Sequence, residues 1–209
     1  MKIGYFVTAC NEIEELTRLL LMLKTNITDN DCIGILLDEN NHTPEVQSLC
    51  EKFILPDNSI RLAYAPLNND FATFKNVGYN LLDDCDWIFQ LDADELPSST
   101  LMANLQEILT MNPDVDLIYL PRINTVEGLT KEHIDKWGWN VNNEGWVNWP
   151  DYQGRIYKRD KNIKWEGKVH ERITGIKNLS QIPPRDDLAL HHPKTIERQE
   201  RQNKLYESI

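Results

Sequence analysis

The chain has 209 residues, enough for one domain with a sizeable core. Hydrophobic residues make up 41% and charged residues 26%, the balance of a soluble globular protein. The formal net charge of −11 argues against a surface that binds nucleic acid or anionic membrane as a whole. No stretch approaches 18 apolar residues, so no transmembrane segment is expected. The apolar run at 3–10 predicts a first strand, because it is too short for a signal peptide.

The four cysteines are Cys10, Cys32, Cys50 and Cys85. They form no Cys-x-x-Cys pair and have no His cluster beside them. This pattern favours buried free thiols over disulfides or a zinc site. Free thiols indicate a reducing compartment, and we therefore expect a cytoplasmic location.

The first 120 residues alternate predicted strands with predicted helices. Strands are expected at 3–8, 32–37, 60–64, 87–91 and 115–120. Helices are expected at 12–24, from Pro44 after the N-cap Thr43, at 70–82, and after an N-cap at Ser98 or Ser99. This alternation predicts an α/β fold with a doubly wound, mostly parallel sheet. The first strand is followed by no Gly-x-Gly-x-x-Gly and no Walker pattern, which argues against NAD or a P-loop nucleotide.

The character of the chain changes after Pro121. Four of its six tryptophans, Trp137, Trp139, Trp146 and Trp149, fall within thirteen residues. They predict either a small satellite core or a flat stacking platform for a sugar or a base. Short strands are expected at 153–158 and 163–165, and a polar helix at 195–206.

The segment Asp92-Ala93-Asp94-Glu95 directly follows the apolar strand at 87–91. Ligands of open α/β sheets bind outside the carboxyl ends of the strands. Paired carboxylates at such a place suit Mg²⁺ or Mn²⁺, which are held together with substrate phosphates. The alternative is that these acids merely cap the next helix.

Three other strand ends also carry polar groups: Thr8-Ala9-Cys10-Asn11-Glu12, then Asp38, then the helix start at 69–76. Together with the segment at 92–95, this order resembles the nucleotide-diphospho-sugar domain of family 2 glycosyltransferases, which have the GT-A fold. Lys75 stands where that family more often has Arg. Lys keeps the positive charge but loses the bidentate fork.

The second half extends the resemblance. The run at 151–157 resembles the Arg-Leu-Phe strand of a subgroup that includes lipopolysaccharide-core transferases, and the run at 165–171 resembles its Gly-x-Val-His-Glu signature. Compact versions like this one look similar to proteins encoded by tailed phages, which would place the protein in the host cytoplasm. The short length and the Trp-rich insert depart from the subgroup. The resemblance implies one GT-A domain, with a nucleotide-sugar-binding half at 1–121 and a smaller mixed α+β acceptor-side half at 122–209.

The resemblance implies roles that carry over residue by residue. The nucleotide-sugar site would comprise Thr8, Ala9, Asn11, Glu12, Asp38, Phe71, Lys75, Asn76, Asp92, Ala93 and Arg155. The metal, Mn²⁺ or Mg²⁺, would be held by Asp92, Asp94 and His170. The catalytic base would be Asp151, with Glu171 as second choice. The acceptor would meet Trp137, Trp139, Trp146, Trp149 and Gln153. The pair His191 and His192 is expected to be a loop pair before the last helix rather than a second metal site.

These assignments predict a metal-dependent, inverting glycosyltransferase that uses a nucleoside-diphosphate sugar, with UDP as the favoured nucleotide. The acceptor would be a saccharide or lipopolysaccharide, or a hydroxymethylated pyrimidine in phage DNA. The DNA alternative rests on the segment 155–177, in which eight Lys or Arg against three acids give a charge of +5. A nucleotidyltransferase is disfavoured because the turn at 8–11 has no Gly. The alternative from another class is a non-catalytic module that binds carbohydrate or nucleic acid.

Overall fold

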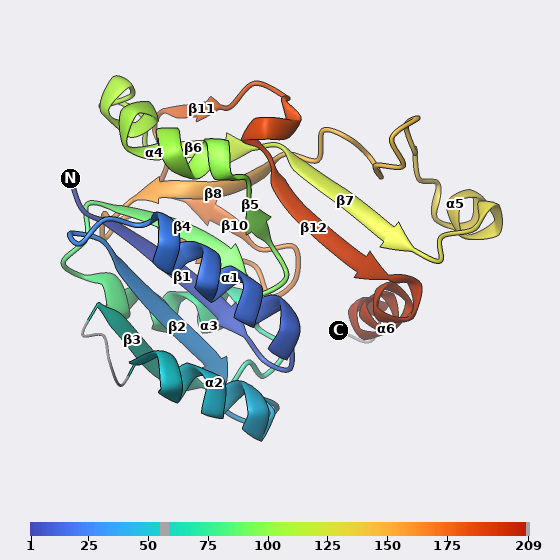
Figure 1. Ribbon diagram of the computed structural model, residues 1–209, viewed down its shortest axis with the longest axis horizontal. Coiled ribbons are helices and arrows are strands. Elements are labelled where there is room, and N and C mark those ends of the chain that lie inside the picture. Colours follow the sequence, from blue (N-terminus) through green and yellow to red (C-terminus); the bar gives the residue numbers. More distant parts are fainter. Residues whose placement is uncertain (55–58, 208–209) are drawn as a thin grey trace.

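The computed structural model describes residues 1–54 and 59–207, and its centre is a seven-stranded sheet with helices on both faces (Figure 1). The strand order is β11-β6-β8-β4-β1-β2-β3. The strands of this sheet are β1 (Ile3–Ala9), β2 (Cys32–Asp38), β3 (Ile60–Ala65), β4 (Trp87–Asp92), β6 (Leu117–Leu120), β8 (Gln153–Lys158) and β11 (Leu179–Gln181). The predicted mostly parallel α/β sheet is therefore confirmed.

Strands β1, β2, β3 and β4 pair in parallel, so their carboxyl ends meet at one edge. Strand β8 runs antiparallel between β4 and β6, and β11 joins the far side of β6. Both come from beyond residue 121. The central sheet is thus built from both of the parts that the sequence suggested.

Alternation along β1 explains the two layers of the core. Ile3, Tyr5 and Val7 face the helices α1 (Ile13–Asn26), α2 (Pro44–Ile54) and α4 (Ser99–Met111). Phe6 faces the opposite layer, which holds α3 (Phe71–Gly78) and the 3₁₀ turn η1 (Tyr79–Leu82). Strand β2 is buried at all seven positions, as expected for a strand covered on both faces.

Helix starts follow the capping signals in the sequence. Asp70 accepts a hydrogen bond from the backbone N–H of Thr73, and Ser98 accepts one from Leu101. The helix expected at 70–82 ends at Gly78 and continues as η1. A Cβ on Gly78 would lie 2.2 Å from the ring of Phe6, so only glycine lets this helix lie so close to β1.

A second, smaller sheet extends away from the first (Figure 1). It contains β5 (Leu96–Pro97), β12 (Leu190–Thr195) and β7 (Arg122–Glu127), in that order. Its long parallel pair, β7 and β12, leads to α5 (Lys131–Trp137) and α6 (Ile196–Glu207). The remaining elements are the hairpin β9 (Lys164–Glu166) with β10 (Arg172–Thr174), and the turn η2 (Asp186–Leu188).

Candidate active site

Polar side chains from both sheets meet at the carboxyl ends of β1 and β4. Thr8 of β1 is paired with Asp92 of β4, and the Thr8 hydroxyl donates a hydrogen bond to Asp92 Oδ1 over 2.9 Å. Beyond Asp92 the chain turns sharply, because the backbone N–H of Glu95 donates to the carbonyl of Asp92. This turn sends Asp92, Asp94 and Glu95 to different partners.

Asp92 is surrounded by cations. Arg155 Nη2 donates to its Oδ2 over 2.7 Å, and Lys75 Nζ lies 3.6 Å from its Oδ1. Burial alone would raise the pKa of Asp92, but the charges of Lys75 and Arg155 outweigh it and hold the pKa well below its usual range. Asp92 is therefore a carboxylate, as both predicted roles for it require.

Two arginines bind Glu95, and one of them, Arg122, links it to Asp151. Glu95 is buried, and its Oε1 receives Arg155 Nη2 at 2.5 Å and Arg122 Nη1 at 2.9 Å. Arg122 also donates through Nε and Nη2 to Asp151 Oδ2, at 2.9 and 2.6 Å. A buried ion pair of this kind becomes strongly destabilising when one partner is removed.

Asp151, the first choice for the base, has partners on both oxygens. Besides Arg122, the side chain of Asn124 donates to its Oδ2 at 2.8 Å, and Gln153 donates to its Oδ1 at 2.9 Å. Burial would raise the pKa of Asp151, but the charge of Arg122 and these hydrogen bonds outweigh burial and lower it. The predicted acceptor residue Gln153 thus holds Asp151 in place.

Asp94 meets His192 of β12, a residue that the sequence did not place in the site. His192 Nε2 lies 3.2 Å from Asp94 Oδ2, and His192 Nδ1 lies 2.7 Å from Asn124 Oδ1. Because the Asn124 amide donates its Nδ2 to Asp151, its oxygen faces His192. His192 must then carry a proton on Nδ1, and in its neutral form it turns the Nε2 lone pair toward Asp94.

The pKa directions agree with a neutral imidazole facing a carboxylate. Burial lowers the pKa of His192 and outweighs the Asp94 carboxylate, which favours the protonated imidazole. Burial would raise the pKa of Asp94, but His192, Lys194 and Arg198 together lower it. A lone pair and a carboxylate oxygen 3.2 Å apart repel each other unless a cation or a proton lies between them. The geometry of these two side chains therefore fits a shared cation.

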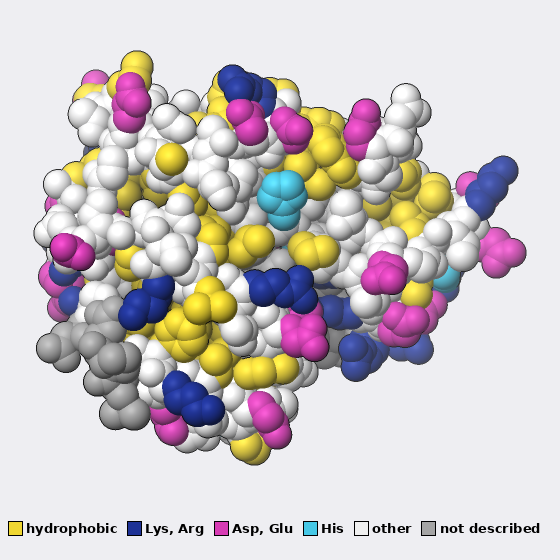
Figure 2. All heavy atoms as spheres, viewed as in Figure 1, with side chains coloured by type: hydrophobic (Ala, Val, Ile, Leu, Met, Phe, Trp, Pro, Cys, Tyr) yellow, Lys and Arg dark blue, Asp and Glu magenta, His cyan; other side chains and the backbone are white. Residues whose placement is uncertain are grey.

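Helix α6 closes one side of this region. Arg198 Nη2 lies 3.2 Å from Asp94 Oδ2 and 3.2 Å from Glu12 Oε1, and its Nη1 donates to Glu15 Oε1 at 2.8 Å. The other oxygen of Glu12 accepts the backbone N–H groups of Cys10 and Asn11. Figure 2 shows Lys and Arg side chains beside acidic ones over the region of α6. The predicted turn after β1 is thus tied to the last helix.

Lys75 and Asn76 join α3 to the β9–β10 hairpin. Lys75 is buried, donates to Glu171 Oε1 at 2.7 Å, and lies 4.5 Å from the ring centre of Trp165. Asn76 exchanges two hydrogen bonds with the backbone of Trp165. Asn76 therefore positions β9, whereas Lys75 reaches Asp92 and the predicted second base, Glu171.

The other residues predicted at the nucleotide are spread along the strand ends. Asp38 is buried and accepts hydrogen bonds from the backbones of Asn40 and Leu67 and the side chain of Asn41, so it orders the loops after β2 and β3. The N–H of Phe71 donates to the carbonyl of Lys168. Ala9 and Ala93 are buried beside the polar groups, and the backbone N–H of Ala93 donates to Thr8.

The three predicted metal ligands do not form one cluster. Among residues 1–54 and 59–207, only Cys32, Asp84 and Cys85 bring three possible ligand atoms within 4.8 Å of one another. His170 lies in the left-handed backbone region, with φ of 56°, in the loop between β9 and β10. It belongs to the Lys75 and Glu171 side of the site, whereas the imidazole that reaches Asp94 is that of His192.

The tryptophans form two ring pairs next to this site. Trp137 and Trp139 have ring centres 4.6 Å apart, and those of Trp146 and Trp149 are 5.0 Å apart. All four are half-buried. Their loop is fastened to β7 by a hydrogen bond from the N–H of Val147 to the carbonyl of Asn124. The predicted platform therefore begins beside the residue that links Asp151 to His192.

The basic segment 155–177 does not form one free surface. Arg155 points inward to Asp92 and Glu95, Lys158 pairs with Asp116, and Lys164 pairs with Glu166. Arg159 lies over the ring of Tyr79, 3.6 Å from its centre. Lys161, Lys168, Arg172 and Lys177 are exposed, so the charge of +5 counted along the sequence is divided between the interior, several local pairs and the surface.

Five residues of the site escaped the sequence analysis: Glu95, Arg122, Asn124, His192 and Arg198. Glu95 was visible as the last acid of the strand-end segment. The other four lie on β7, β12 and α6. The expectation of a loop for His191 and His192 was wrong, because both residues lie on strand β12, which pairs with β7 and turns His192 toward Asp94. Among the described residues, no helix is long and apolar enough to cross a membrane.

Comparison with known proteins supports the fold. No protein-family model and no curated sequence matches the chain. Solved structures do match: S. aureus TarS 1–349 superposes with a TM-score of 0.62 at 11% identity, over 92% of this chain and 60% of that one. The same protein in complex with UDP-GlcNAc gives 0.60 at 13%, over 93% and 59%. The chain thus spans about 60% of TarS 1–349, and the likeness confirms the GT-A type of α/β fold.

Proposed function

We propose that this protein is a metal-dependent, inverting glycosyltransferase that uses a UDP-sugar. The observation that carries the proposal is the meeting of Asp94 and His192 beside Asp92, at the strand ends where such a fold receives ligands. The matching TarS structures include complexes with UDP-GlcNAc and with UDP, which supports the choice of nucleotide.

The ligand atoms that Asp94 and His192 offer fit a divalent cation. Within the described residues, Oδ1 of Asp94 receives no hydrogen bond, while its Oδ2 faces the nitrogen lone pair of His192. A ligating histidine usually donates its other ring N–H to an acceptor that fixes its tautomer, which is what Asn124 does here. An imidazole ligand favours Mn²⁺ over Mg²⁺. The bound metal would neutralise charge that develops on the departing diphosphate.

The remaining cations are placed to act on the same phosphates. Lys75 and Arg155 flank Asp92, and both are buried with acidic partners on one side. A diphosphate arriving at this edge would be attracted by both side chains, since charge-assisted hydrogen bonds to phosphate are among the strong ones. The Thr8 hydroxyl also donates to Asp92 Oδ1 and keeps that oxygen in position.

Two carboxylates compete for the role of base, which takes the proton of the acceptor hydroxyl as it attacks the sugar. Asp151 is next to the tryptophan loop, but its lowered pKa and four hydrogen bonds make it a weak base as it stands. Glu171 uses one oxygen for Lys75 and, among the described residues, leaves Oε2 without a hydrogen bond. Catalytic hydrogen bonds often rearrange when substrate binds, so geometry without substrate leaves both in contention.

Replacing each of the two carboxylates by its amide distinguishes the base from a residue that only positions its neighbours. If Asp151 is the base, Asp151→Asn loses turnover but keeps Mn²⁺ and donor affinity. If Asp151 only positions Asn124 and His192, the same change weakens Mn²⁺ binding. Turnover that survives in Asp151→Asn and disappears in Glu171→Gln assigns the base to Glu171.

A saccharide acceptor is favoured over DNA. The tryptophan pairs adjoin Asn124 and Asp151, and sugar rings stack on such faces. In the basic segment 155–177, Arg155 is turned inward and Lys158 and Lys164 are paired with acids, so only part of its charge is available to a phosphate backbone. Trp146→Ala should raise the KM for the acceptor and leave hydrolysis of the donor unchanged.

The test of the proposal is thermal unfolding with UDP, GDP, CDP or ADP, each with and without Mn²⁺. A ligand at 100 times its Kd adds about 2.7 kcal/mol, or roughly 5–10 °C for a chain of this size. We expect such a shift with UDP and Mn²⁺ for the wild type and for the control Asp114→Ala, whose side chain is exposed and distant in sequence from the site. Asp94→Ala should lose it.

A non-catalytic binding module is the rival function. It accounts for the half-buried tryptophan rings, and it predicts binding of saccharide without turnover. Release of UDP from a UDP-sugar that requires Mn²⁺ and is lost in Asp94→Ala excludes the rival. No nucleotide-dependent shift, together with saccharide binding, refutes the transferase and leaves the module.

A further inference from the structure

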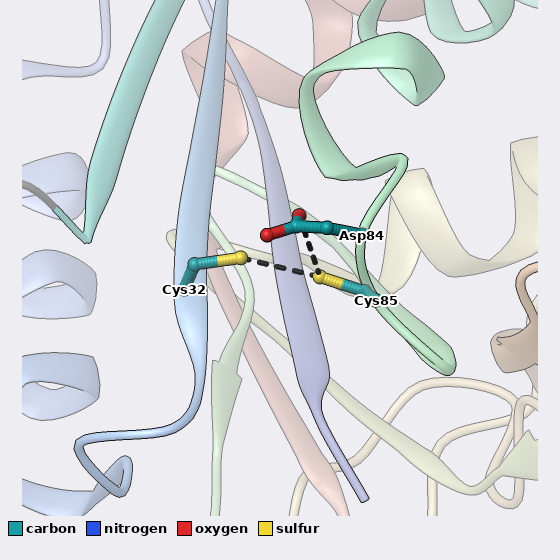
Figure 3. Close-up of side chains that lie close together, drawn as sticks. All are labelled: Cys32, Asp84 and Cys85. Atoms are coloured by element: carbon teal, nitrogen blue, oxygen red, sulfur yellow. Dashed lines mark hydrogen bonds between the residues drawn. The ribbon is translucent and has the colours of Figure 1, made fainter.

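A second group of reactive side chains, Cys32, Asp84 and Cys85, lies at the amino-terminal ends of the parallel strands β2 and β4. Figure 3 shows the three side chains close together. Cys32 begins β2, and Asp84 and Cys85 lie in the turn just before β4. The candidate active site is at the other ends of these parallel strands. Six or seven strand residues, at about 3.3 Å each, put roughly 20 Å between the two regions. The proposed transferase chemistry does not use this group.

The two sulfur atoms are in direct contact. Sγ of Cys32 lies 3.2 Å from Sγ of Cys85 in the interior. Gly4 of β1 lies between them, since it pairs with Cys32 on one side and with Ile88 of β4 on the other. A Cβ on Gly4 would lie 2.9 Å from the sulfur of Cys85. The absence of a side chain at position 4 therefore makes the room in which the thiols meet.

Two cationic side chains, those of Arg61 and Lys2, bind Asp84 next to the two cysteines. Arg61 donates to both oxygens of Asp84, at 2.7 and 2.8 Å, and Lys2 donates to its Oδ2 at 2.5 Å. Oδ1 of Asp84 is 3.9 Å from Sγ of Cys85. Both oxygens of Asp84 are thus engaged by cations, and a metal ion would have to displace or approach two positive charges. These features disfavour a metal site and favour a thiolate.

The two thiols differ in acidity. The hydrogen bond from Cys85 lowers the pKa of Cys32, burial opposes this, and the charges of Arg61 and Lys2 lower it further. The interaction with Cys32 and burial raise the pKa of Cys85. Because the Cys85 thiol also faces the carboxylate of Asp84, which disfavours a second negative charge, Cys32 is the sulfur assigned as the nucleophile and Cys85 the thiol that resolves it.

We propose that Cys32 and Cys85 are an oxidation site, a thiol pair that hydrogen peroxide converts to a disulfide across β1. The thiolate of Cys32 attacks one peroxide oxygen, the O–O bond breaks, and the departing hydroxide takes a proton to form water. Cys85 then loses its proton and attacks the sulfenic sulfur, the S–O bond breaks, and a second water leaves. Two thiols are oxidised by two electrons and one peroxide is reduced to two waters.

The two sulfur atoms are already close to disulfide bonding distance. The sulfurs need to approach by only about 1.2 Å from their contact distance to reach a disulfide. The bond would join positions 53 residues apart and fasten the start of β2 to the turn before β4. Closing a loop of that length in the unfolded chain should raise the melting temperature by roughly 5–15 °C.

The experiment treats the full-length reduced protein with hydrogen peroxide, blocks remaining thiols by alkylation, and measures intact mass and cross-linked peptides. We expect the wild type and the control Cys10→Ser to lose two hydrogens, gain the Cys32–Cys85 peptide and melt at a higher temperature. Cys32→Ser and Cys85→Ser should give no cross-link. Reducing agent should restore the original mass and melting temperature.

Other results overturn the proposal. These are no cross-link in the wild type, a disulfide that involves Cys10 or Cys50, sulfinic acid at Cys32 without a cross-link, and an oxidised form that melts no higher than the reduced one. Stoichiometric Zn²⁺ bound by the reduced wild type and lost in Cys85→Ser would show a metal site instead. The cross-link does not depend on sugar transfer, so failure here and failure of the proposed function are separate results.

Discussion

Asn124 offers a direct test of how the site is held together. Its amide accepts the His192 Nδ1–H at 2.7 Å and donates to Asp151 at 2.8 Å. Replacing it by Ala removes the acceptor that fixes the histidine tautomer, so His192 is free to protonate on Nε2, the atom that faces Asp94. Asp151 keeps Arg122 and Gln153, so the fold should lose only about 1 kcal/mol.

The size of the functional effect follows from the loss of a partner behind a metal ligand. Such a loss lowers metal affinity by about 10–100-fold, which corresponds to about 1.4–2.7 kcal/mol. Mn²⁺ binding in the presence of UDP, measured by titration calorimetry, is the assay. The control is Asn104→Ala, because Asn104 lies on α4 rather than in the site and its side chain donates to the carbonyl of Thr100.

Two outcomes would refute the role of Asn124 behind the metal site. If Asn124→Ala binds Mn²⁺ as tightly as the wild type while His192→Ala does not, the histidine is a ligand but the amide does not orient it. If neither change weakens binding, the cation does not lie between Asp94 and His192 at all.

Three further predictions concern the fold around the site. Arg155→Met should destabilise the protein by about 3–5 kcal/mol in urea unfolding, because two carboxylates lose their buried partner, whereas Arg18→Met, at an exposed ion pair, should change stability by less than about 1 kcal/mol. The lowered pKa of Asp151 adds stability that is present above its unfolded pKa of about 3.9 and is lost as the pH falls through the lower folded value. Asp151→Asn should therefore flatten the fall in unfolding free energy between about pH 5 and pH 2, and an unchanged slope would contradict the pairing. Gly78→Ala should destabilise by about 1–3 kcal/mol, since its Cβ would overlap the buried ring of Phe6; a neutral result in thermal unfolding would show that the ring can move.

Much of the fold could be predicted because its signals are local. The apolar run of β2, the leucine stripe of α1 and the caps at Asp70 and Ser98 each act within a few residues, and each element formed close to its predicted bounds. The acids after β4 were also visible, because parallel strands place their carboxyl ends at one edge and a polar residue there is exposed to a ligand.

The composition of the site depended on distant contacts. Asp94 and His192 are 98 residues apart in sequence, and Arg155 and Asp92 are 63 apart. The sequence pattern predicted β8 as a strand but not its position. Because β8 inserts antiparallel between β4 and β6, its Arg155 points to Asp92. The pair His191 and His192 likewise could not show which ring turns inward, since neighbouring residues of a strand point to opposite faces and only the pairing of β12 with β7 selects one.

The sequence by itself therefore determined the alternation of strands and helices and the acidic strand end, because periodicity and chain direction are properties of short segments. Tertiary structure alone decided which histidine meets Asp94, which arginines neutralise Glu95 and Asp151, and which two cysteines touch. Those choices follow from strand register and packing across the sheets, where a shift of one residue would turn each side chain to the other face.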